Sequence, residues 1–521
     1  NTTGANNVAI GCCALKSNTT ASNNTSVGHD SLKSNTTGTG NNAFGALSLD
    51  ANTEGDYNVA IGDSSLGAQT TADGNTAVGS AAGAALTTGA NNVAVGLEAL
   101  KTSTTQGSHT AVGACALRLT TGAQNTGFGF RALATNSSGQ CNTAVGKDAL
   151  CANTTASYNT AVGLLSMTKN TEGCANTAVG LYSLACNTTG DAHIAIGYEA
   201  LLNNTTADCN VAVGCKAMRA NTTGANNTAV GTNALTANTT GGLNTALGES
   251  ALLSNTTASY NVAIGREAAK ATTTGWGNVA IGHQTFIANT TGEKNTAVGI
   301  NALAANTTAH ENTAVGRNAL TANTTGANNV AHGAYALTAN TTGAENTAVG
   351  KDALKLNVGA IQNTAVGTSA LRDNTTGACN TAVGFNSLVQ STTSSSNTAV
   401  GRETLFTNTT GGGNTAMGIC ALYANISGEQ NVAIGLHAMQ DNTTADNNTA
   451  VGFRAMDKNT TGTNNVGIGH DSMRCTTTGG SNTALGVCSL YTNVSGGANI
   501  AIGLNALRLN TASNNLAVGH C

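Results

Sequence analysis

Acidic side chains are the first candidates for chemistry, because carboxylates supply much of the general acid and base catalysis in enzymes. Enzymes that cleave polysaccharides need such carboxylates gathered within several ångströms of one another. The chain has 25 acidic residues among 521, and they are scattered along its length without a recurring pair. We therefore expect no catalytic residues and no enzymatic activity.

The residue spacings in the sequence do not indicate a metal or cofactor site either. The 9 histidines and 14 cysteines show none of the paired spacings of structural zinc sites. A calcium-binding β-roll carries Asp at a fixed place in a Gly-rich nonapeptide, and this sequence has no such column. We expect no bound metal and no cofactor.

Composition excludes further partners and favours a single repetitive domain. Lys and Arg number 21 and the net charge is -4, without the basic clusters that bind nucleic acid or anionic membranes. No apolar run approaches the roughly 20 residues that cross a bilayer. Proline is absent, Gly numbers 65, and the composition is uniform from end to end. Residues 1–521 are expected to form one continuous repeat array.

A five-residue block, in one copy Asn227-Thr228-Ala229-Val230-Gly231, recurs along the whole sequence. There are 31 copies, and 28 of the 30 intervals between their first residues are 17 residues long, while two are 16. Counted from that Asn, the consensus is Asn, Thr or Val, Ala, Val or Ile, Gly, two variable residues, Ala, Leu, two variable residues, Asn-Thr-Thr-Gly and two variable residues. These are positions 1 to 17 below.

The block at positions 1 to 5 predicts a strand that ends in a turn. Position 5 is Gly in every repeat, including Gly11, Gly231 and Gly519, which indicates a positive φ or a close backbone approach. Positions 2 and 4 alternate with 1, 3 and 5, which is the period of a β-strand of about five residues. Position 4 is apolar in all repeats but one, so we expect it to be buried, with His332 as a tolerated or hydrogen-bonded exception.

The remaining columns predict a second core file and a corner. Position 9 is Leu or Met in nearly every repeat, and position 8 before it is always Ala, Ser or Thr. This segment fits either a second short strand or a single helical turn. Positions 12 to 15, as in Asn238-Thr239-Thr240-Gly241, have the composition of a turn. Stacking would align these Asn side chains into a hydrogen-bonded ladder.

A 17-residue unit is too small to fold alone and must stack on its neighbours. The predicted fold is an all-β solenoid with one repeat per coil, in which 31 coils at about 4.8 Å each form a rod roughly 150 Å long. Helical solenoids have longer repeats, and leucine-rich repeats have several spaced leucines that are missing here. No terminal caps are evident, because the sequence begins and ends within a repeat. We expect either a longer natural chain or end-to-end filaments.

The cysteines do not form columns that could make a disulfide ladder, since no two adjacent repeats carry Cys at the same position. Several lie at positions 6 and 7, which we expect to face outward. These are candidates for links between chains, with free thiols as the alternative: Cys12, Cys13, Cys115, Cys420, Cys488 and Cys521.

Most repeats also place an Asn-x-Ser/Thr sequon at position 12, including Asn18, Asn153, Asn289 and Asn459. In a secreted eukaryotic protein these would be glycosylation sites. The alternative is that an Asn-Thr corner generates the sequon by coincidence.

Blocks such as Asn312-Thr313-Ala314-Val315-Gly316, followed by Ala319-Leu320 and Asn323-Thr324-Thr325-Gly326, resemble repeats in the tail fibres of marine phages and related bacterial surface proteins. The first block is also similar to the shorter head repeats of trimeric autotransporter adhesins, which are left-handed β-rolls. The resemblance covers the whole chain. It implies an elongated fibre on a cell or virion surface that self-associates, with trimers as one form, and takes part in adhesion.

The predicted function is therefore an extracellular structural fibre that extends and attaches, with a cell-surface or glycan receptor as a candidate partner. The alternative is an ice-binding or matrix-forming protein, because the Thr columns at positions 13 and 14 could present hydroxyl and methyl groups to water. Thr neighbours in an extended segment point to opposite faces, which weighs against a flat Thr surface there.

Overall fold

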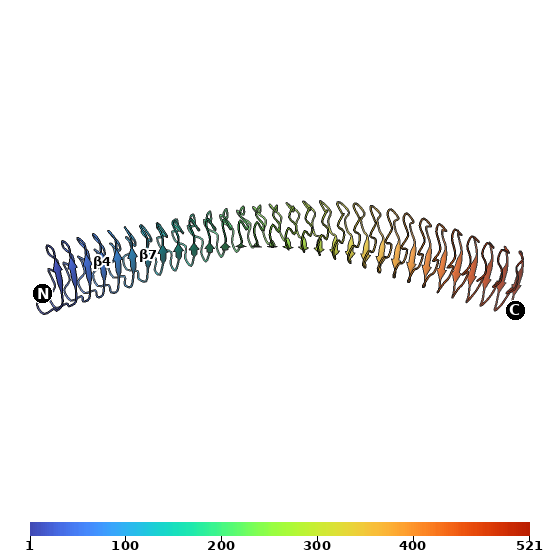
Figure 1. Ribbon diagram of the computed structural model, residues 1–521, viewed down its shortest axis with the longest axis horizontal. Coiled ribbons are helices and arrows are strands. Elements are labelled where there is room, and N and C mark those ends of the chain that lie inside the picture. Colours follow the sequence, from blue (N-terminus) through green and yellow to red (C-terminus); the bar gives the residue numbers. More distant parts are fainter. Residues whose placement is uncertain (521) are drawn as a thin grey trace. The chain divides into compact units, whose positions relative to one another are not determined.

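The computed structural model describes residues 1–520, and that part of the chain contains 31 short parallel β-strands and no α-helix. The fold is a β-solenoid with one 17-residue repeat per coil, as the sequence predicts. The chain divides into two compact units, Asn1–Tyr260 and the residues from Asn261 onward. In Figure 1 each coil contributes one strand, and successive coils within a unit lie side by side.

Every strand is three residues long and occupies positions 2 to 4 of its repeat. The first unit contains β1 (Val8–Ile10), β2 (Thr25–Val27), β3 (Asn42–Phe44), β4 (Val59–Ile61), β5 (Thr76–Val78), β6 (Val93–Val95), β7 (Thr110–Val112), β8 (Thr126–Phe128), β9 (Thr143–Val145), β10 (Thr160–Val162), β11 (Thr177–Val179), β12 (Ile194–Ile196), β13 (Val211–Val213), β14 (Thr228–Val230) and β15 (Thr245–Leu247).

The second unit contains β16 (Val262–Ile264), β17 (Val279–Ile281), β18 (Thr296–Val298), β19 (Thr313–Val315), β20 (Val330–His332), β21 (Thr347–Val349), β22 (Thr364–Val366), β23 (Thr381–Val383), β24 (Thr398–Val400), β25 (Thr415–Met417), β26 (Val432–Ile434), β27 (Thr449–Val451), β28 (Val466–Ile468), β29 (Thr483–Leu485), β30 (Ile500–Ile502) and β31 (Leu516–Val518).

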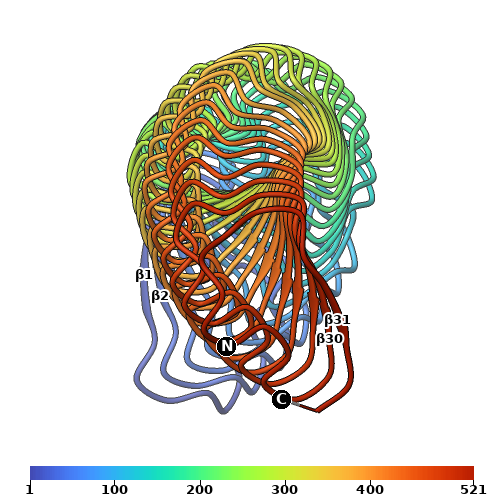
Figure 2. The same ribbon diagram turned by 90° about the vertical axis from the view of Figure 1, so that its right-hand side faces the viewer.

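Within each unit every strand pairs in parallel with the strand of the next coil, and like positions are aligned. In the first unit, for example, Ala161 of β10 pairs with Ala178 of β11. In the second, Ala348 of β21 pairs with Ala365 of β22. The 17-residue period therefore places each residue against its own counterpart in the next coil. Figure 2 shows that neighbouring coils have closely similar traces.

The strands confirm the predicted alternation, but the predicted direction of the side chains is wrong. Position 3 faces the interior, where residues such as Ala161 and Ala348 are fully buried. Position 4 faces outward, so Ile10 and Phe44 are 61% and 41% exposed. His332, expected to replace a core residue, is exposed as well. The strand is also three residues long instead of about five. The coil is too narrow for a Val-sized side chain at this point, and only Ala, Ser or Gly occurs at position 3.

The predicted core file at position 9 is confirmed, and so is the small-residue column beside it. Leu100, Met218 and most of their counterparts are fully buried, as are most of the Ala and Ser side chains at position 8. One substitution is compensated inside its own coil. Where position 9 is Gly83, position 12 is Leu86, which is fully buried and lies against the space that a Cβ on Gly83 would enter.

Positions 6 to 11, called the turn segment below, form neither a second strand nor a helical turn. Non-glycine residues at positions 7 and 9 have positive φ, for example 54° at Asp30 and 46° at Leu32. Because these residues are left-handed, the backbone amides of positions 7 and 9 point toward opposite neighbouring coils. The amide of Asp30 donates to the carbonyl of Cys12 in the coil before, at 2.9 Å, and that of Leu32 donates to Ser48 in the coil after, at 3.0 Å.

The position 5 glycines have the conformation and the close approach that their sequence pattern predicts. Gly11, Gly231 and Gly519 have φ values of 130°, 134° and 137°. A Cβ on Gly231 would lie 2.6 Å from the carbonyl carbon and oxygen of Gly248 in the next coil. Both the dihedral angle and the stacking distance therefore require Gly.

Two files of buried Asn run through each unit. At position 1, the backbone amide of Asn41 donates to Asn24 Oδ1 at 2.8 Å, and Asn41 Nδ2 donates to the carbonyl of Gly55 at 2.8 Å. At position 12, Asn35 Nδ2 donates to Asn18 Oδ1 at 3.0 Å, which is the predicted ladder. The amide is suited to such a file because each side chain both donates and accepts.

The position 12 file is interrupted where a coil lacks Asn. Four Asn in the described part of the chain have a buried Oδ1 without a hydrogen-bond partner: Asn52, Asn255, Asn374 and Asn459. In each case the next coil carries a different residue at position 12, namely Gln69, Thr272, Ser391 and Thr476. The unpaired oxygen is therefore a direct consequence of the substitution in the coil that follows.

The first 16-residue coil lacks position 14. Its corner reads Thr120-Thr121-Gly122, and Thr120 takes the place of the position 12 Asn by accepting a hydrogen bond from Asn136 Nδ2 at 2.9 Å. Position 14 is exposed at the corner in the other coils. Its loss leaves the pairing of Thr110 with Thr126 in register.

We expect Gly231→Ala to destabilise the coils around it by at least about 2 kcal/mol, because it combines a glycine-only dihedral angle with a backbone clash. Thr232→Ala is the matched control, since position 6 is exposed there and is Ala in several other coils. Hydrogen exchange at amides of the neighbouring coils measures the change. Equal protection in the two variants would contradict this explanation of the glycine column.

We expect Thr476→Asn to stabilise its region by about 1 kcal/mol, because it supplies a donor to Asn459 Oδ1 and removes the unpaired Thr476 hydroxyl. Thr476→Ser keeps a hydroxyl without an amide and should give no gain. The readout is the hydrogen-exchange protection of the adjacent coils. Destabilisation by Thr476→Asn would mean that an Asn side chain at this corner cannot adopt the hydrogen-bonded conformation of the position 12 ladder.

Candidate interaction surface

The outward side chains of positions 2 and 4 form one continuous surface along each unit, called the strand face below. Position 2 is mostly Thr or Val, and position 4 is Val, Ile, Leu, Phe or Met except at His332. Neither position carries Lys, Arg, Asp or Glu in any of the 31 repeats. Alternation in the short strands aims both columns at the same side. The sequence interpretation missed this surface because it assigned position 4 to the core.

Within residues 1–520, the hydroxyl groups on this surface do not bond to other parts of the chain. Position 2 threonines such as Thr160 and Thr347 make no side-chain hydrogen bond in the described residues. Threonines at position 13 behave differently: Thr36 Oγ1 donates to the carbonyl of Thr53 at 3.0 Å, and Thr154 Oγ1 to that of Thr171 at 3.0 Å. Of the two Thr columns considered for ice binding, position 13 is thus occupied by bonds between coils, whereas position 14, as at Thr37 and Thr155, is exposed at the corner.

Apolar residues at position 6 extend the strand face past the glycine turn. Eleven of them are at least 36% exposed: Leu97, Phe130, Leu164, Leu181, Tyr198, Ile300, Phe385, Ile419, Leu436, Val487 and Leu504. Other repeats place charged residues there, for example Lys147 and Arg266. Position 6 therefore varies along the array and forms the border of the apolar surface.

The turn segment carries most of the charge, and many of its charges are paired. An acid at position 7 meets a base at position 10 of the same coil in Asp30–Lys33 at 3.0 Å and Glu98–Lys101 at 2.7 Å. Arg118 of the next coil also lies 3.5 Å from Glu98. Such exposed pairs contribute little stability individually. Both signs occur together, so no strong field of one sign develops along this segment.

Two buried histidines replace Asn in the position 1 file. His109 Nδ1 accepts the backbone amide of Asn125 at 3.2 Å, while its Nε2 is buried without a partner. Burial lowers the pKa of His109 to about 4 from an ordinary 6.5. His193 Nδ1 likewise accepts the amide of Asn210 at 3.2 Å, and burial lowers the pKa of His193 too. Both rings serve as neutral acceptors that maintain the file.

All thirteen cysteines among the described residues are free thiols. Cys12 is exposed, and Cys13, Cys115, Cys420 and Cys488 are partly exposed, as expected for positions 6 and 7. Cys12 and Cys13 have their sulfur atoms 3.6 Å apart without a bond. Cys521 lies outside the described residues. A role of these thiols in linking chains stays a prediction.

The four sequon asparagines named from the sequence have their side chains inside the coil, at most 2% exposed. Asn153 Nδ2 donates to Asn136 Oδ1 at 2.6 Å and to the carbonyl of Ala156 at 3.0 Å. Asn459 Nδ2 donates to Asn442 Oδ1 at 3.1 Å and to Gly462 at 3.0 Å. Attachment of a glycan to Nδ2 would break these bonds, so the ladder accounts for the Asn without glycosylation.

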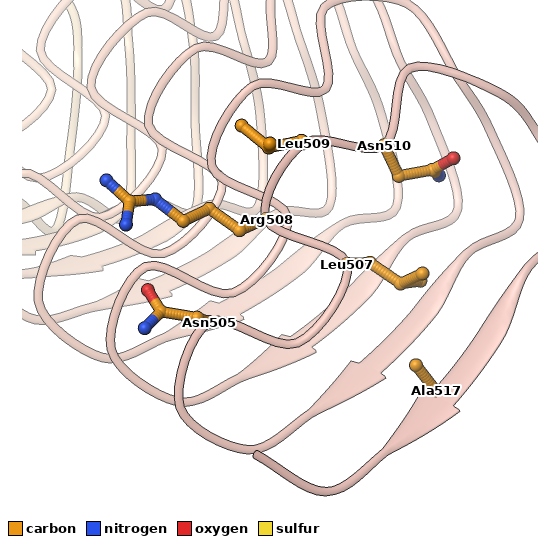
Figure 3. A pocket seen from close by; sticks show the side chains of 6 residues that line it. All are labelled: Asn505, Leu507, Arg508, Leu509, Asn510 and Ala517. Carbon is orange, nitrogen blue, oxygen red and sulfur yellow. The ribbon is translucent and has the colours of Figure 1, made fainter. Parts of the chain in front are cut away.

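An open recess lies at the coil that contains Leu507. Its volume is about 470 Å³. Its lining, shown in Figure 3, is Asn505, Leu507, Arg508, Leu509, Asn510 and Ala517. Leu507 and Ala517 continue the core columns of positions 9 and 3. The recess is a section through the solenoid core and contains no pair of acidic groups.

Residues 1–520 contain no group of three or more His, Cys, Asp or Glu side chains that could hold a metal ion. Within the same range, no helix is long and apolar enough to span a membrane. Comparison with protein-family models gave no match, and comparison with curated protein sequences gave no significant match. The strand face is therefore the most extensive candidate site that the described residues offer.

The low pKa of His109 predicts that acid destabilises its coil. The unfolded chain binds a proton near the ordinary pKa of 6.5, whereas the folded chain resists protonation down to a pKa of about 4. The contribution of neutral His109 to the free energy of unfolding is fully present above about pH 6.5. It is lost as the pH falls to about 4, and the loss is roughly 3 kcal/mol at most.

Because carboxylates also titrate in this range, the test compares the chain with His109→Asn, which restores the consensus residue. Hydrogen exchange around β7 at about pH 4.5 and about pH 7 should show a larger acid-dependent loss of protection for the original chain. A pH dependence unchanged by His109→Asn would contradict the assignment to this ring.

Proposed function

We propose that this protein is an extracellular structural fibre whose coils form a shaft for extension and attachment. The observation that carries the proposal is the uninterrupted in-register stacking of one coil type through each unit. The first unit stacks 15 strands and the second 16. At about 4.8 Å for each parallel strand, either unit alone reaches roughly 70 Å along its stack.

A shaft requires stiffness along its axis, and the coils supply it through repeated short-range contacts. Each coil contributes three strand residues and backbone amides of the turn segment to the junction with its neighbour, and most coils add two Asn side chains. Solenoid stability is approximately the sum of such nearest-neighbour contacts. Adding coils therefore lengthens the rod without requiring a larger core.

The distribution of reactive groups supports a structural role over a catalytic one. Most acidic side chains of the turn segment are paired with Lys or Arg, as in Asp352–Lys355 at 3.1 Å and Arg372–Asp373 at 2.8 Å. The buried polar groups are mainly Asn and small hydroxyl residues in the two files and at position 8. A hydrolase would need a pair of carboxylates around a substrate-sized recess, and repetition of the coil favours uniform surfaces instead.

The extracellular location and a receptor on a cell surface or glycan are part of the proposal, and they rest on the resemblance to phage and bacterial surface fibres. Self-association belongs to it as well. A fibre that attaches must present its binding groups outward, and the variable positions 6, 7, 10, 11, 16 and 17 are the columns available for that purpose.

Negative-stain electron microscopy of the purified chain tests the shaft. We expect thin rods at least about 70 Å long, because one unit alone has that extent. A sample incubated with polysaccharides should release no reducing ends above the level given by buffer. Compact particles of similar length and width would contradict a shaft, and release of sugar ends would contradict a purely structural role.

A further inference from the structure

We propose that the strand face is the surface through which the chain associates with a further copy of itself. This inference rests on the proposed structural function and specifies the partner and the contact surface. It concerns positions 2 and 4, and each unit provides the surface separately.

The exposure of large apolar side chains is the first argument. Fifteen position 4 residues are at least 36% exposed: Ile10, Phe44, Ile61, Phe128, Val145, Ile196, Leu247, Ile281, Val349, Val366, Met417, Ile434, Ile468, Ile502 and Val518. Within each unit they belong to one column, in which like positions of neighbouring coils are aligned. Contiguous apolar patches larger than a few hundred Å² usually mark an interaction site on soluble proteins.

The available area is sufficient for a stable contact. Three strand residues extend about 10 Å and adjacent strands are about 4.8 Å apart, so each strand covers about 50 Å². The 15 strands of the first unit therefore present about 700 Å². Specific interfaces bury about 800 Å² on each partner. Either unit comes close to this value before the apolar residues of position 6 are added.

The absence of charge favours a copy of the same chain over an unrelated partner. In a two-fold contact the same patch lies on both sides, so any charged column would meet its own charge. The strand face has no Lys, Arg, Asp or Glu, whereas the turn segment carries both signs. A dissimilar partner could be matched by complementary charges and would impose no such restriction.

The irregular sizes at position 4 argue against ice as the occupant. A crystal lattice requires a plane of constant height, yet Phe44, Phe128, His332 and Met417 interrupt the Val and Ile column. Side chains of a second copy can adjust around such projections. The position 2 hydroxyls can bond across the contact or to trapped water, as polar groups of protein interfaces commonly do.

The test uses the full chain and two triple variants in the same three coils. Ile196→Lys, Ile281→Lys and Ile434→Lys place charges on the strand face at sites 36% to 39% exposed. The matched control places three lysines at the exposed corner of those coils, with Thr206→Lys, Thr291→Lys and Thr444→Lys. Circular dichroism and thermal unfolding should match the original chain in both variants.

Sedimentation velocity from about 1 to about 100 µM measures association. We expect the original chain and the corner variant to form oligomers, and the strand-face variant to associate at least about 100-fold more weakly, because like charges would be buried together. Equal association of both variants would overturn the proposal. So would a monomeric original chain, including one that shapes growing ice crystals into facets.

The two proposals fail separately in this experiment. Micrographs of the strand-face variant should still show single rods, because its coils remain stacked when the contact between copies is lost. If the original chain formed rods that do not associate, the proposed shaft would stand and the proposed interface would be wrong. If the original chain formed compact particles, the proposed shaft itself would be wrong.

Discussion

The structure depends on the register that stacks every residue on its own counterpart in the next coil. At a separation of about 4.8 Å a side chain is accepted only if it tolerates a copy of itself. Asn does so by donating to one neighbour and accepting from the other, as Asn35 does between Asn18 and Asn52. Ala and Leu do so by packing. A buried charge would lie against an identical charge in the next coil. Charged residues accordingly occur in the variable columns and, as Glu54 and Glu172, at the exposed position 14.

The register also explains how much of the fold could be predicted. A repeat without insertions fixes which residues stack, so the solenoid, the Gly turn, the Leu file and the Asn ladder followed from the sequence. Polarity alone placed position 4 in the core in place of position 3, because Val is more apolar than Ala. The variation of side-chain size within each column would have identified the buried position correctly. Position 3 is never larger than Ala or Ser, whereas position 4 ranges from Val to Phe44 and Met417, and a close-packed interior does not accept such changes in volume.

The turn segment was harder to predict because its backbone is unusual for its residues. Leu at position 9 adopts a positive φ in coil after coil, for example 50° at Leu150. Packing and the amide bonds to both neighbouring coils offset the conformational cost. A signal was present nonetheless: in a chain rich in Thr and Val, positions 7, 9 and 17 contain no β-branched residue. Such residues are strongly disfavoured in the left-handed region, and these three columns adopt it.

The same constraint separates the surfaces that can recognise a unique partner from those that cannot. Variable columns change from coil to coil, so a particular neighbourhood, such as the stacked rings of Phe406 and Tyr423, occurs at one place. The strand face instead offers nearly the same groups at every step. A ligand with a single contact site would bind it at many equivalent positions with little discrimination. A partner with the same spacing would engage all of the coils at once, and another copy of this chain has that spacing by construction.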